Sequence, residues 1–359
     1  MVRLSFLSCR TLSFRFTAGR AKYSSHQCDL PKRLGSFPQA SGLGREHASP
    51  LARHWSATSR PFSSHCTGRD SVATSFAESA TMVEELKSNK MYGGFNTRYQ
   101  HDSKACGCKM TFTVFFPPAA ATEKVPVIYY LSGLTCTDEN VIQKSGIQKK
   151  AAELGVAIIA PDTSPRGHNI DGEAENYDFG VGAGFYLNAT VEKWKNWRMY
   201  EYITEELPAA LATLPGLDVT KAGITGHSMG GHGALTIFLK NPTKYKSLSA
   251  FSPICNPMIV PWGEKALTGY LGEDKEAWKE YDATELLKGF NGKCVPVLID
   301  IGTSDNFMHQ LSPQTFASVA MEKNIPITMR MQEGYDHSYF FIQTFVDDHV
   351  EHHAKMLKA

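Results

Sequence analysis

The stretch Gly226-His227-Ser228-Met229-Gly230 matches the pattern Gly-x-Ser-x-Gly and is the starting point for interpreting the whole chain. A short apolar and β-branched run, 222–225, precedes it, and 231–240 has the pattern of a helix that starts from it. A serine on a tight turn between a strand and a helix needs neighbours without side chains, because the two elements approach closely there. The sequence therefore predicts that Ser228 is the nucleophile of a serine hydrolase.

The rest of the body alternates strands with helices, as that motif requires. The strand patterns are continuous apolar or β-branched runs, typical of strands that are covered on both faces. The predicted strands are 110–116, 125–131, 156–160, 222–225, 247–251, 295–301 and 325–331, and the predicted helices are 145–154, 197–213, 231–240 and 338–357. We expect an α/β-hydrolase fold, a mostly parallel doubly wound sheet with helices on both faces, in a single catalytic domain over 82–359.

The acid of such a site should follow the serine in the chain and precede the histidine. Asp305 lies in the loop directly after the predicted strand 295–301, where it can orient an imidazole. Asp300 is the rival, but it lies inside the strand, where the pleat fixes the direction of its side chain. The sequence favours Asp305.

The base is expected in the loop that follows the last strand. His337 lies there, in Glu333-Gly334-Tyr335-Asp336-His337, at the same end of the sheet as Ser228. His309 is less suited, because it precedes the last strand. The other histidines have plainer interpretations, namely loop packing beside the serine for His227 and His232, and a solvated face of the terminal helix for His349, His352 and His353.

Two backbone N–H groups are expected to stabilise the oxyanion. One belongs to Met229, the residue after the nucleophile, and the other comes from the loop after an early strand. That loop is Leu131-Ser-Gly-Leu-Thr-Cys136, which follows the strand 125–131, and we assign the second donor to Leu134. Cys136 lies in the same loop, and three roles stay open for it: a thiol that lines the substrate site, a packing residue, or a nucleophile.

The composition of the whole chain excludes several classes of protein. Its 359 residues are 42% hydrophobic and 20% charged, with a formal net charge of +1, so no nucleic-acid partner is expected. No run reaches the roughly 18 apolar residues of a membrane span. The eight cysteines are scattered, which favours free thiols in a reducing compartment, and none belongs to a group with metal-ligand spacing, so no metal is expected.

Residues 1–81 differ from the body. They hold eleven of the 37 Lys and Arg but only four of the 36 Asp and Glu, and they are rich in serine without a sustained hydrophobic period. This composition is typical of an organelle transit peptide. The alternative is an unstructured or mis-joined segment, because Met82 looks like a second start and every recognisable motif follows it. Either way we exclude this basic extension from the fold.

Seven stretches go beyond the general fold and resemble the S-formylglutathione hydrolase family, also called the esterase D family. The resemblance covers about 86–358, nearly the whole body. The stretches are Leu131-Ser-Gly-Leu-Thr-Cys-Thr137, Ala160-Pro-Asp-Thr-Ser-Pro-Arg-Gly167, Gly182-Ala-Gly-Phe-Tyr186, Gly226-His-Ser-Met-Gly-Gly-His-Gly-Ala234, Phe251-Ser-Pro-Ile-Cys-Asn-Pro257, Tyr281-Asp-Ala-Thr284 and Gln332-Glu-Gly-Tyr-Asp-His-Ser338.

The resemblance implies a triad at Ser228, Asp305 and His337. It implies hydrolysis of S-formylglutathione to glutathione and formate, a step in formaldehyde detoxification, with carboxylesterase activity on small acyl esters. It also implies that the enzyme needs no cofactor, resides in the cytoplasm and forms a homodimer; a mitochondrial location is the alternative if residues 1–81 are a genuine transit peptide. One departure is that the stretch 307–310, after the acid, is shorter than in the family pattern.

The long polar connection 161–188 is expected to be functional, because loops of this length in a compact domain usually are. The resemblance makes it a candidate to hold glutathione, an anionic peptide, with Arg166 as a contact. A loop-anchoring ion pair is the alternative for Arg166. Two other activities on the same fold are alternatives to the thioesterase, an acyltransferase and a general carboxylesterase, whereas a non-catalytic binding protein would be expected to lack part of the triad.

Overall fold

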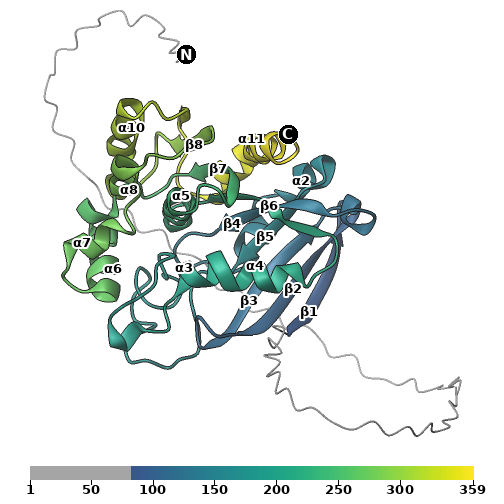
Figure 1. Ribbon diagram of the computed structural model, residues 1–359, viewed down its shortest axis with the longest axis horizontal. Coiled ribbons are helices and arrows are strands. Elements are labelled where there is room, and N and C mark those ends of the chain that lie inside the picture. Colours follow the sequence, from purple (N-terminus) through teal and green to yellow (C-terminus); the bar gives the residue numbers. More distant parts are fainter. Residues whose placement is uncertain (1–81) are drawn as a thin grey trace, which may run out of the picture. The chain divides into compact units, whose positions relative to one another are not determined.

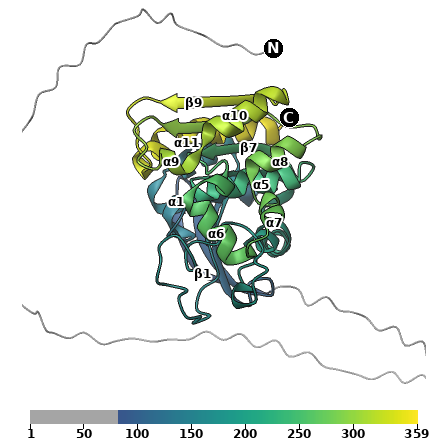
Figure 2. The same cartoon turned by 90° about the vertical axis from the view of Figure 1, so that its left-hand side faces the viewer.

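Residues 82–359, the part of the chain that this computed structural model describes, contain a nine-stranded sheet in the order β1-β2-β3-β5-β4-β6-β7-β8-β9 (Figure 1). Six strands from β5 to β9 run parallel, and β1 to β3 pair antiparallel at one side. Figure 2 shows β1 and β9 at opposite ends of the sheet. The strands are β1 Val83–Met91, β2 Gly94–Ser103, β3 Cys108–Phe116, β4 Val125–Leu131, β5 Ala157–Pro161, β6 Leu217–Gly226, β7 Tyr245–Phe251, β8 Val297–Gly302 and β9 Ile327–Gln332.

The antiparallel strands β1 and β2 were not predicted. They form a hairpin whose turn residues, Tyr92 and Gly93, both have positive φ, 48° and 77°. β1 is exposed along most of its length, so it lacks the apolar alternation by which a half-buried strand is recognised. The predicted extension 1–81, with its two interpretations, lies outside the described residues.

Helices cover both faces of the sheet, as predicted for an α/β-hydrolase fold. Alternate residues of β4 point to different cores: Ile128 and Tyr130 pack with α1, α2 and α11, whereas Val127 and Tyr129 pack with α4, α5, α8 and α10. Figure 1 shows α2 beside α11, and the two are in contact. These helices are α1 Glu139–Lys144, α2 Gln148–Leu154, α4 Leu207–Ala212, α5 Met229–Lys240, α8 Ala283–Gly289, α10 Pro313–Glu322 and α11 Tyr339–Leu357.

The remaining helical segments lie in the connections. The predicted helix 197–213 is α3 Met199–Glu201 and α4, joined by a π-helical turn, Tyr202–Glu206. The predicted helix 145–154 begins only at Gln148, because a separate helix, α1, precedes it. The others are α6 Pro261–Leu271, α7 Lys275–Lys279, α9 Met308–Leu311 and short 3-10 turns at Pro118–Ala121, Glu192–Trp194 and Pro257–Ile259.

The terminal helix α11 does not carry its histidines on a solvated face, so that prediction is wrong. His349 and His353 are each 1% exposed, and His352 is partly buried. The Nδ1 atom of His349 lies 2.9 Å from Oγ of Ser249, and its Nε2 lies 3.3 Å from Oδ2 of Asp300. His349 thus faces polar groups of β7 and β8. This contact depends on how α11 packs on the sheet, so the sequence of the helix alone does not predict it.

Candidate active site

Ser228 lies on the turn between β6 and α5, one residue before the helix begins. Its backbone has φ 58° and ψ −118°, a region that costs about 1–3 kcal/mol for a residue with a side chain. The turn is fixed because the N–H of Ser228 donates to the carbonyl of Phe251 at 2.9 Å, and the carbonyl of Ser228 accepts from the N–H of His232 at 3.0 Å. The structure thus places Ser228 in the strained strand–turn–helix geometry that the motif predicted.

The glycines on either side of the turn have no room for a side chain. A Cβ atom on Gly226 would lie 2.2 Å from the carbonyl oxygen of Gly230, and one on Gly230 would lie 1.9 Å from that of Leu131. Both distances are far below any real contact between these atoms. The close approach of β4, β6 and α5 therefore requires glycine at both positions.

His337 and Asp305 meet at the end of two neighbouring strands. Asp305 follows β8 and His337 follows β9, and because these strands are parallel their loops emerge at the same edge. The Nδ1 atom of His337 lies 2.6 Å from Oδ2 of Asp305. The Asp305 side chain is fully buried, while that of His337 is 14% exposed. Hydrogen bonds of this length that involve a carboxylate are among the strong ones.

The surroundings of Asp305 favour its ionised form. Burial acts to raise the pKa of Asp305, but the hydrogen bond to His337, the charge of His337 and the N–H of Phe307 outweigh it and hold the pKa below its ordinary value. The Phe307 N–H donates to Oδ1 of Asp305 at 2.8 Å. The rival carboxylate, Asp300, is engaged elsewhere, with Nε of Arg330 at 2.6 Å from its Oδ1.

His337 contacts His227, the residue before Ser228. The two imidazole rings lie 4.4 Å apart, centroid to centroid, and His227 directly precedes Ser228. Burial, followed by the nearby charge of His337, lowers the pKa of His227 well below its ordinary value, so His227 is neutral at physiological pH. His337, with Asp305 bound to it, therefore lies beside the residue that directly precedes Ser228.

The loop after β4 lies against this turn. A Cβ atom on Gly133 would lie 3.2 Å from Cβ of Ser228. Within the described loops and turns, no acceptor binds the N–H of Leu134 or that of Met229. The two N–H groups that the sequence analysis expects to bind an oxyanion therefore have no acceptor in these described loops and turns, beside Ser228.

Comparisons with known proteins agree with this geometry. The model of the Esterase family matches residues 103–352. The chain is 57% identical to S-formylglutathione hydrolase of Arabidopsis thaliana over 282 residues, which are 78% of this chain and 99% of that protein. It is 53% identical to the Rattus norvegicus S-formylglutathione hydrolase over 280 residues, 77% of this chain and 99% of that protein. The chain belongs to the S-formylglutathione hydrolase family.

Solved structures support the same assignment. An S-formylglutathione hydrolase from Agrobacterium tumefaciens matches with a TM-score of 0.74 and 46% identity, covering 76% of this chain and 99% of that one. A fluorophosphonate-binding serine hydrolase from Staphylococcus aureus, with a TM-score of 0.59 and 19% identity over 73% of this chain and 98% of that one, shows the shared fold. As a member of the S-formylglutathione hydrolase family, the chain is an enzyme of the serine esterase class.

Arg166 forms its hydrogen bonds with Asp162 and Cys136, and not with Ser228, Asp305 or His337. Its Nε and Nη2 atoms each lie 2.8 Å from one carboxylate oxygen of Asp162, and Nη2 also donates to the carbonyl of Cys136 at 3.1 Å. This bidentate pair is the loop-anchoring alternative that the sequence analysis left open. The contact with the Cys136 carbonyl links Arg166 to the loop that carries Leu134.

The side chain of Cys136 is buried, with 9% of the residue exposed. Burial raises the pKa of its thiol, which disfavours the thiolate that a nucleophilic cysteine needs. Its main-chain carbonyl accepts hydrogen bonds from Oγ1 of Thr163 at 2.5 Å and from Arg166. These contacts favour a structural role for Cys136 over that of a nucleophile.

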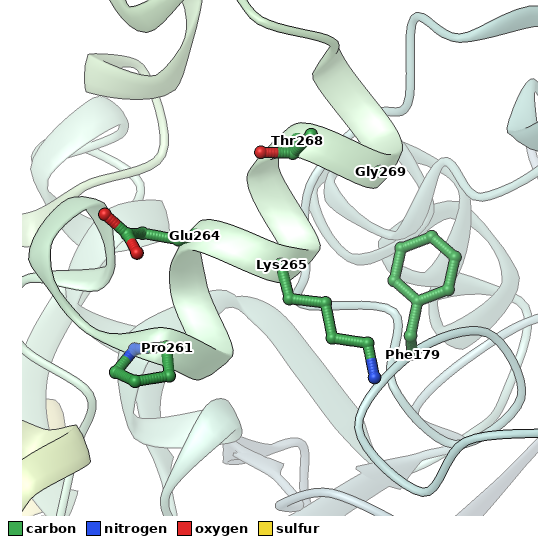
Figure 3. Close-up of a pocket in the computed structure, with 6 residues that line it drawn as sticks. All are labelled: Phe179, Pro261, Glu264, Lys265, Thr268 and Gly269. Carbon is green, nitrogen blue, oxygen red and sulfur yellow. The ribbon is translucent and has the colours of Figure 1, made fainter.

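A pocket of about 520 Å³ lies over α6 (Figure 3), lined by Phe179, Pro261, Glu264, Lys265, Thr268 and Gly269. Its lining includes none of Ser228, Asp305 and His337. Figure 3 shows Lys265 and the ring of Phe179 on the same side of the helix. The charge of Lys265 is already opposed by an ion pair with Asp178. The pocket is therefore a surface feature of α6.

Two negative findings concern residues 82–359. No group of three or more His, Cys, Asp or Glu side chains in this part of the chain is arranged to hold a metal ion. None of its helices combines the length and the apolar character needed to cross a bilayer.

Phe307 and His227 contact His337, and the sequence analysis assigned neither to the site. The ring of Phe307 lies 5.0 Å from that of His337, and its N–H binds Asp305. An aspartate that accepts from the N–H two residues later is a common turn motif, so Asp305-Asn306-Phe307 carried a usable signal. No signal in the sequence indicates the contact between His227 and His337, because it depends on the meeting of two distant loops.

Proposed function

We propose that this chain hydrolyses S-formylglutathione to glutathione and formate, with carboxylesterase activity on small acyl esters as a side reaction. The observation that carries the proposal is the buried hydrogen bond between His337 and Asp305, next to the strained turn of Ser228. It occurs in a chain that shares 57% identity with a protein named S-formylglutathione hydrolase.

Acylation is the first half of the proposed reaction. The Oγ atom of Ser228 attacks the formyl carbon and its proton passes to His337, while the carbonyl electron pair moves onto the oxygen. When the tetrahedral intermediate collapses, the carbon–sulfur bond breaks. His337 then gives its proton to the departing glutathione sulfur, and a formyl ester of Ser228 remains.

Deacylation repeats the sequence with water. His337 takes a proton from a water molecule as the water oxygen bonds to the formyl carbon. Collapse of the second intermediate breaks the bond to Oγ of Ser228, which regains the proton from His337. The product is formic acid, which leaves and loses its remaining proton to solvent as formate, and the site returns to its starting state.

The proposed oxyanion donors are the N–H groups of Leu134 and Met229. Their freedom from other acceptors in the loops and turns of the described chain supports this assignment. One such donor is worth roughly 3–4 kcal/mol of transition-state stabilisation. Asp305 holds His337 in the right tautomer and stabilises the imidazolium, a role that its lowered pKa supports.

The family resemblance also supports a cytoplasmic homodimer that acts on a small molecule, without a nucleic-acid partner. A mitochondrial location is the alternative if the extension 1–81 acts as a transit peptide. Light scattering on the purified protein tests the dimer. Sequencing the N-terminus of the protein isolated from its own cells tests whether residues 1–81 are retained.

The proposed roles are tested by following the acyl-enzyme. Mixing the protein with S-formylglutathione at low pH and recording the intact mass should reveal one formyl group bound to Ser228. The Ser228→Ala variant should show no formyl group and should lose at least about four orders of magnitude in kcat, since the triad acts as a unit. An Ala variant that still turns over substrate would remove Ser228 from the mechanism.

A further inference from the structure

The connection 161–188 holds the loop after β4 on both sides of Leu134. On the N-terminal side, Oη of Tyr186 donates to the carbonyl of Ser132 at 2.8 Å. On the C-terminal side, the N–H of Thr135 donates to the carbonyl of Gly182 at 2.9 Å. The carbonyl of Cys136 accepts from Thr163 and Arg166. The residues that flank Gly133 and Leu134 are thus anchored by one segment of chain.

Tyr186 also contacts the helix that follows the nucleophile. Its ring packs so closely on α5 that a Cβ atom on Gly233 would lie 2.6 Å from it. The next residue upstream strengthens this contact, because the carbonyl of Phe185 lies 3.0 Å from Nε2 of His232, also on α5. Tyr186 therefore bridges the two segments that carry the free N–H groups, α5 with Met229 and the β4 loop with Leu134.

The backbone at this bridge is strained. Phe185 and Tyr186 have φ values of 47° and 50°, and two successive bulky residues in the left-handed region persist only where their surroundings enforce it. Tyr186 is fully buried, so its hydroxyl has no solvent partner to replace the Ser132 carbonyl. This combination of strain, burial and a single defined contact is typical of a segment that is held for a functional purpose.

We infer that the connection 161–188 fixes the position of the loop after β4, which carries Leu134. Tyr186 is a positioning residue, which sets the spacing between the N–H groups of Leu134 and Met229. The inference rests on the proposed function in two respects, because it takes Ser228 as the nucleophile and the N–H groups of Leu134 and Met229 as the oxyanion donors. It assigns the long connection to alignment of the oxyanion donors, and it requires no contact between Tyr186 and the substrate.

Tyr186→Phe is the direct test, because it removes one oxygen and keeps the ring on α5. Tyr202→Phe is the matched control: Tyr202 is also fully buried, and its hydroxyl lies 3.3 Å from Nε2 of His101 on β2. Thr163→Val is a second variant, which removes the hydrogen bond from Thr163 to the carbonyl of Cys136 on the other side of Leu134. Thermal melting of all three variants tests whether each is folded.

Two readouts separate alignment of the oxyanion donors from a general loss of stability. The first is kcat and KM with a nitrophenyl acetate, and the second is the inhibition constant of a small trifluoromethyl ketone. That ketone adds to Oγ of Ser228, so its oxyanion needs the same two donors. For Tyr186→Phe we expect kcat to fall about ten- to hundredfold with KM nearly unchanged, and the inhibition constant to rise by a similar factor. Thr163→Val should show a smaller change of the same kind.

The control variant Tyr202→Phe should keep both kinetic values within about twofold of wild type, as expected for a site remote from the chemistry. Folded Tyr186→Phe with unchanged kcat and inhibition constant would overturn the inference, as would equal losses in Tyr202→Phe. Because the readout is an aryl ester, a failure of the thioester assignment does not affect it. A Ser228→Ala variant that kept esterase activity would instead overturn the proposed function.

Discussion

The Nδ1 atom of His337 lies 2.6 Å from Oδ2 of Asp305, across a separation of 32 residues in the chain. The contact exists because β8 and β9 are neighbouring parallel strands, so that the loops after them share one edge of the sheet. The same pairing leaves Asp300, only five residues before Asp305, inside β8 and bound to Arg330. Two carboxylates of one strand and loop thus have different partners.

Replacing Asp305 by asparagine tests this relationship. We expect Asp305→Asn to lower kcat about ten-thousandfold, because an amide favours the wrong tautomer of the histidine and does not stabilise the imidazolium. Asp336→Asn is the control: Asp336 is adjacent to His337 in sequence, but its carboxylate binds Ser338. Steady-state kinetics on an aryl ester measure both. Similar losses in the two variants would show that the effect is not specific to Asp305.

The tight turn at Ser228 predicts that a side chain added there lowers the stability of the fold strongly. We expect Gly230→Ala to lower the free energy of unfolding by at least about 3 kcal/mol, because the added methyl group would overlap the carbonyl of Leu131 and force the backbone to move. Gly289→Ala is the matched control, since a Cβ atom there meets nothing, and it should be neutral or stabilising by up to about 1 kcal/mol. Urea denaturation measures both. A Gly230→Ala variant as stable as Gly289→Ala would contradict the close packing of this turn.

A pH-dependent part of the stability is expected from His232. Burial lowers the pKa of His232 to about 4, compared with about 6.5 in an unfolded chain. The unfolded state therefore binds the proton more readily, so stability is full above about pH 6.5 and falls as the pH drops towards 4.

The His232→Gln variant isolates this contribution. Between about pH 7.5 and pH 5, His232 should account for about 2 kcal/mol of the loss in unfolding free energy. His232→Gln should therefore lose about that much less than wild type over the same range. Urea titrations at the two pH values give the difference, and an identical pH dependence in both proteins would disprove the assignment.

The sequence predicted the strands that are buried on both faces. The strand 125–131 was predicted with its observed bounds, and the motif around Ser228 predicted the turn that joins β6 and α5. The β1–β2 hairpin was missed because β1 is exposed and polar. The buried face of α11 was also missed, since a histidine that packs against polar groups of a sheet looks in sequence like a solvated one.

In the candidate site too, some residues could be identified from the sequence and others could not. Asp305 and His337 could be chosen because each follows a recognisable strand, and the topology rule for such sheets brings their loops together. The partners that hold the site, such as Tyr186 on the carbonyl of Ser132, could not be chosen. They depend on how the irregular connection 161–188 folds, and its sequence has no period from which a contact could be deduced.

Substitution of Arg166 distinguishes two roles for the connection 161–188, an anchor of the loop after β4 and a contact for glutathione. As an anchor, Arg166 holds Asp162 and the Cys136 carbonyl, so Arg166→Lys should lower kcat on S-formylglutathione and on an aryl ester by a similar factor, leaving KM unchanged. As a glutathione contact, it would instead raise KM for S-formylglutathione alone. Arg198→Lys, which alters a partly exposed pair with Glu201, should change neither substrate's kinetics. A selective rise in KM for the thioester in Arg166→Lys would contradict the anchor role.

We expect the site to prefer the glutathione thioester over esters in general. The most direct measurement compares kcat/KM for S-formylglutathione with kcat/KM for a nitrophenyl acetate on the same protein preparation, with Ser228→Ala as the blank. We predict that the thioester is preferred by at least about tenfold, which corresponds to about 1.4 kcal/mol of additional transition-state stabilisation. An equal or higher kcat/KM for the aryl ester would contradict the claim and leave a general carboxylesterase.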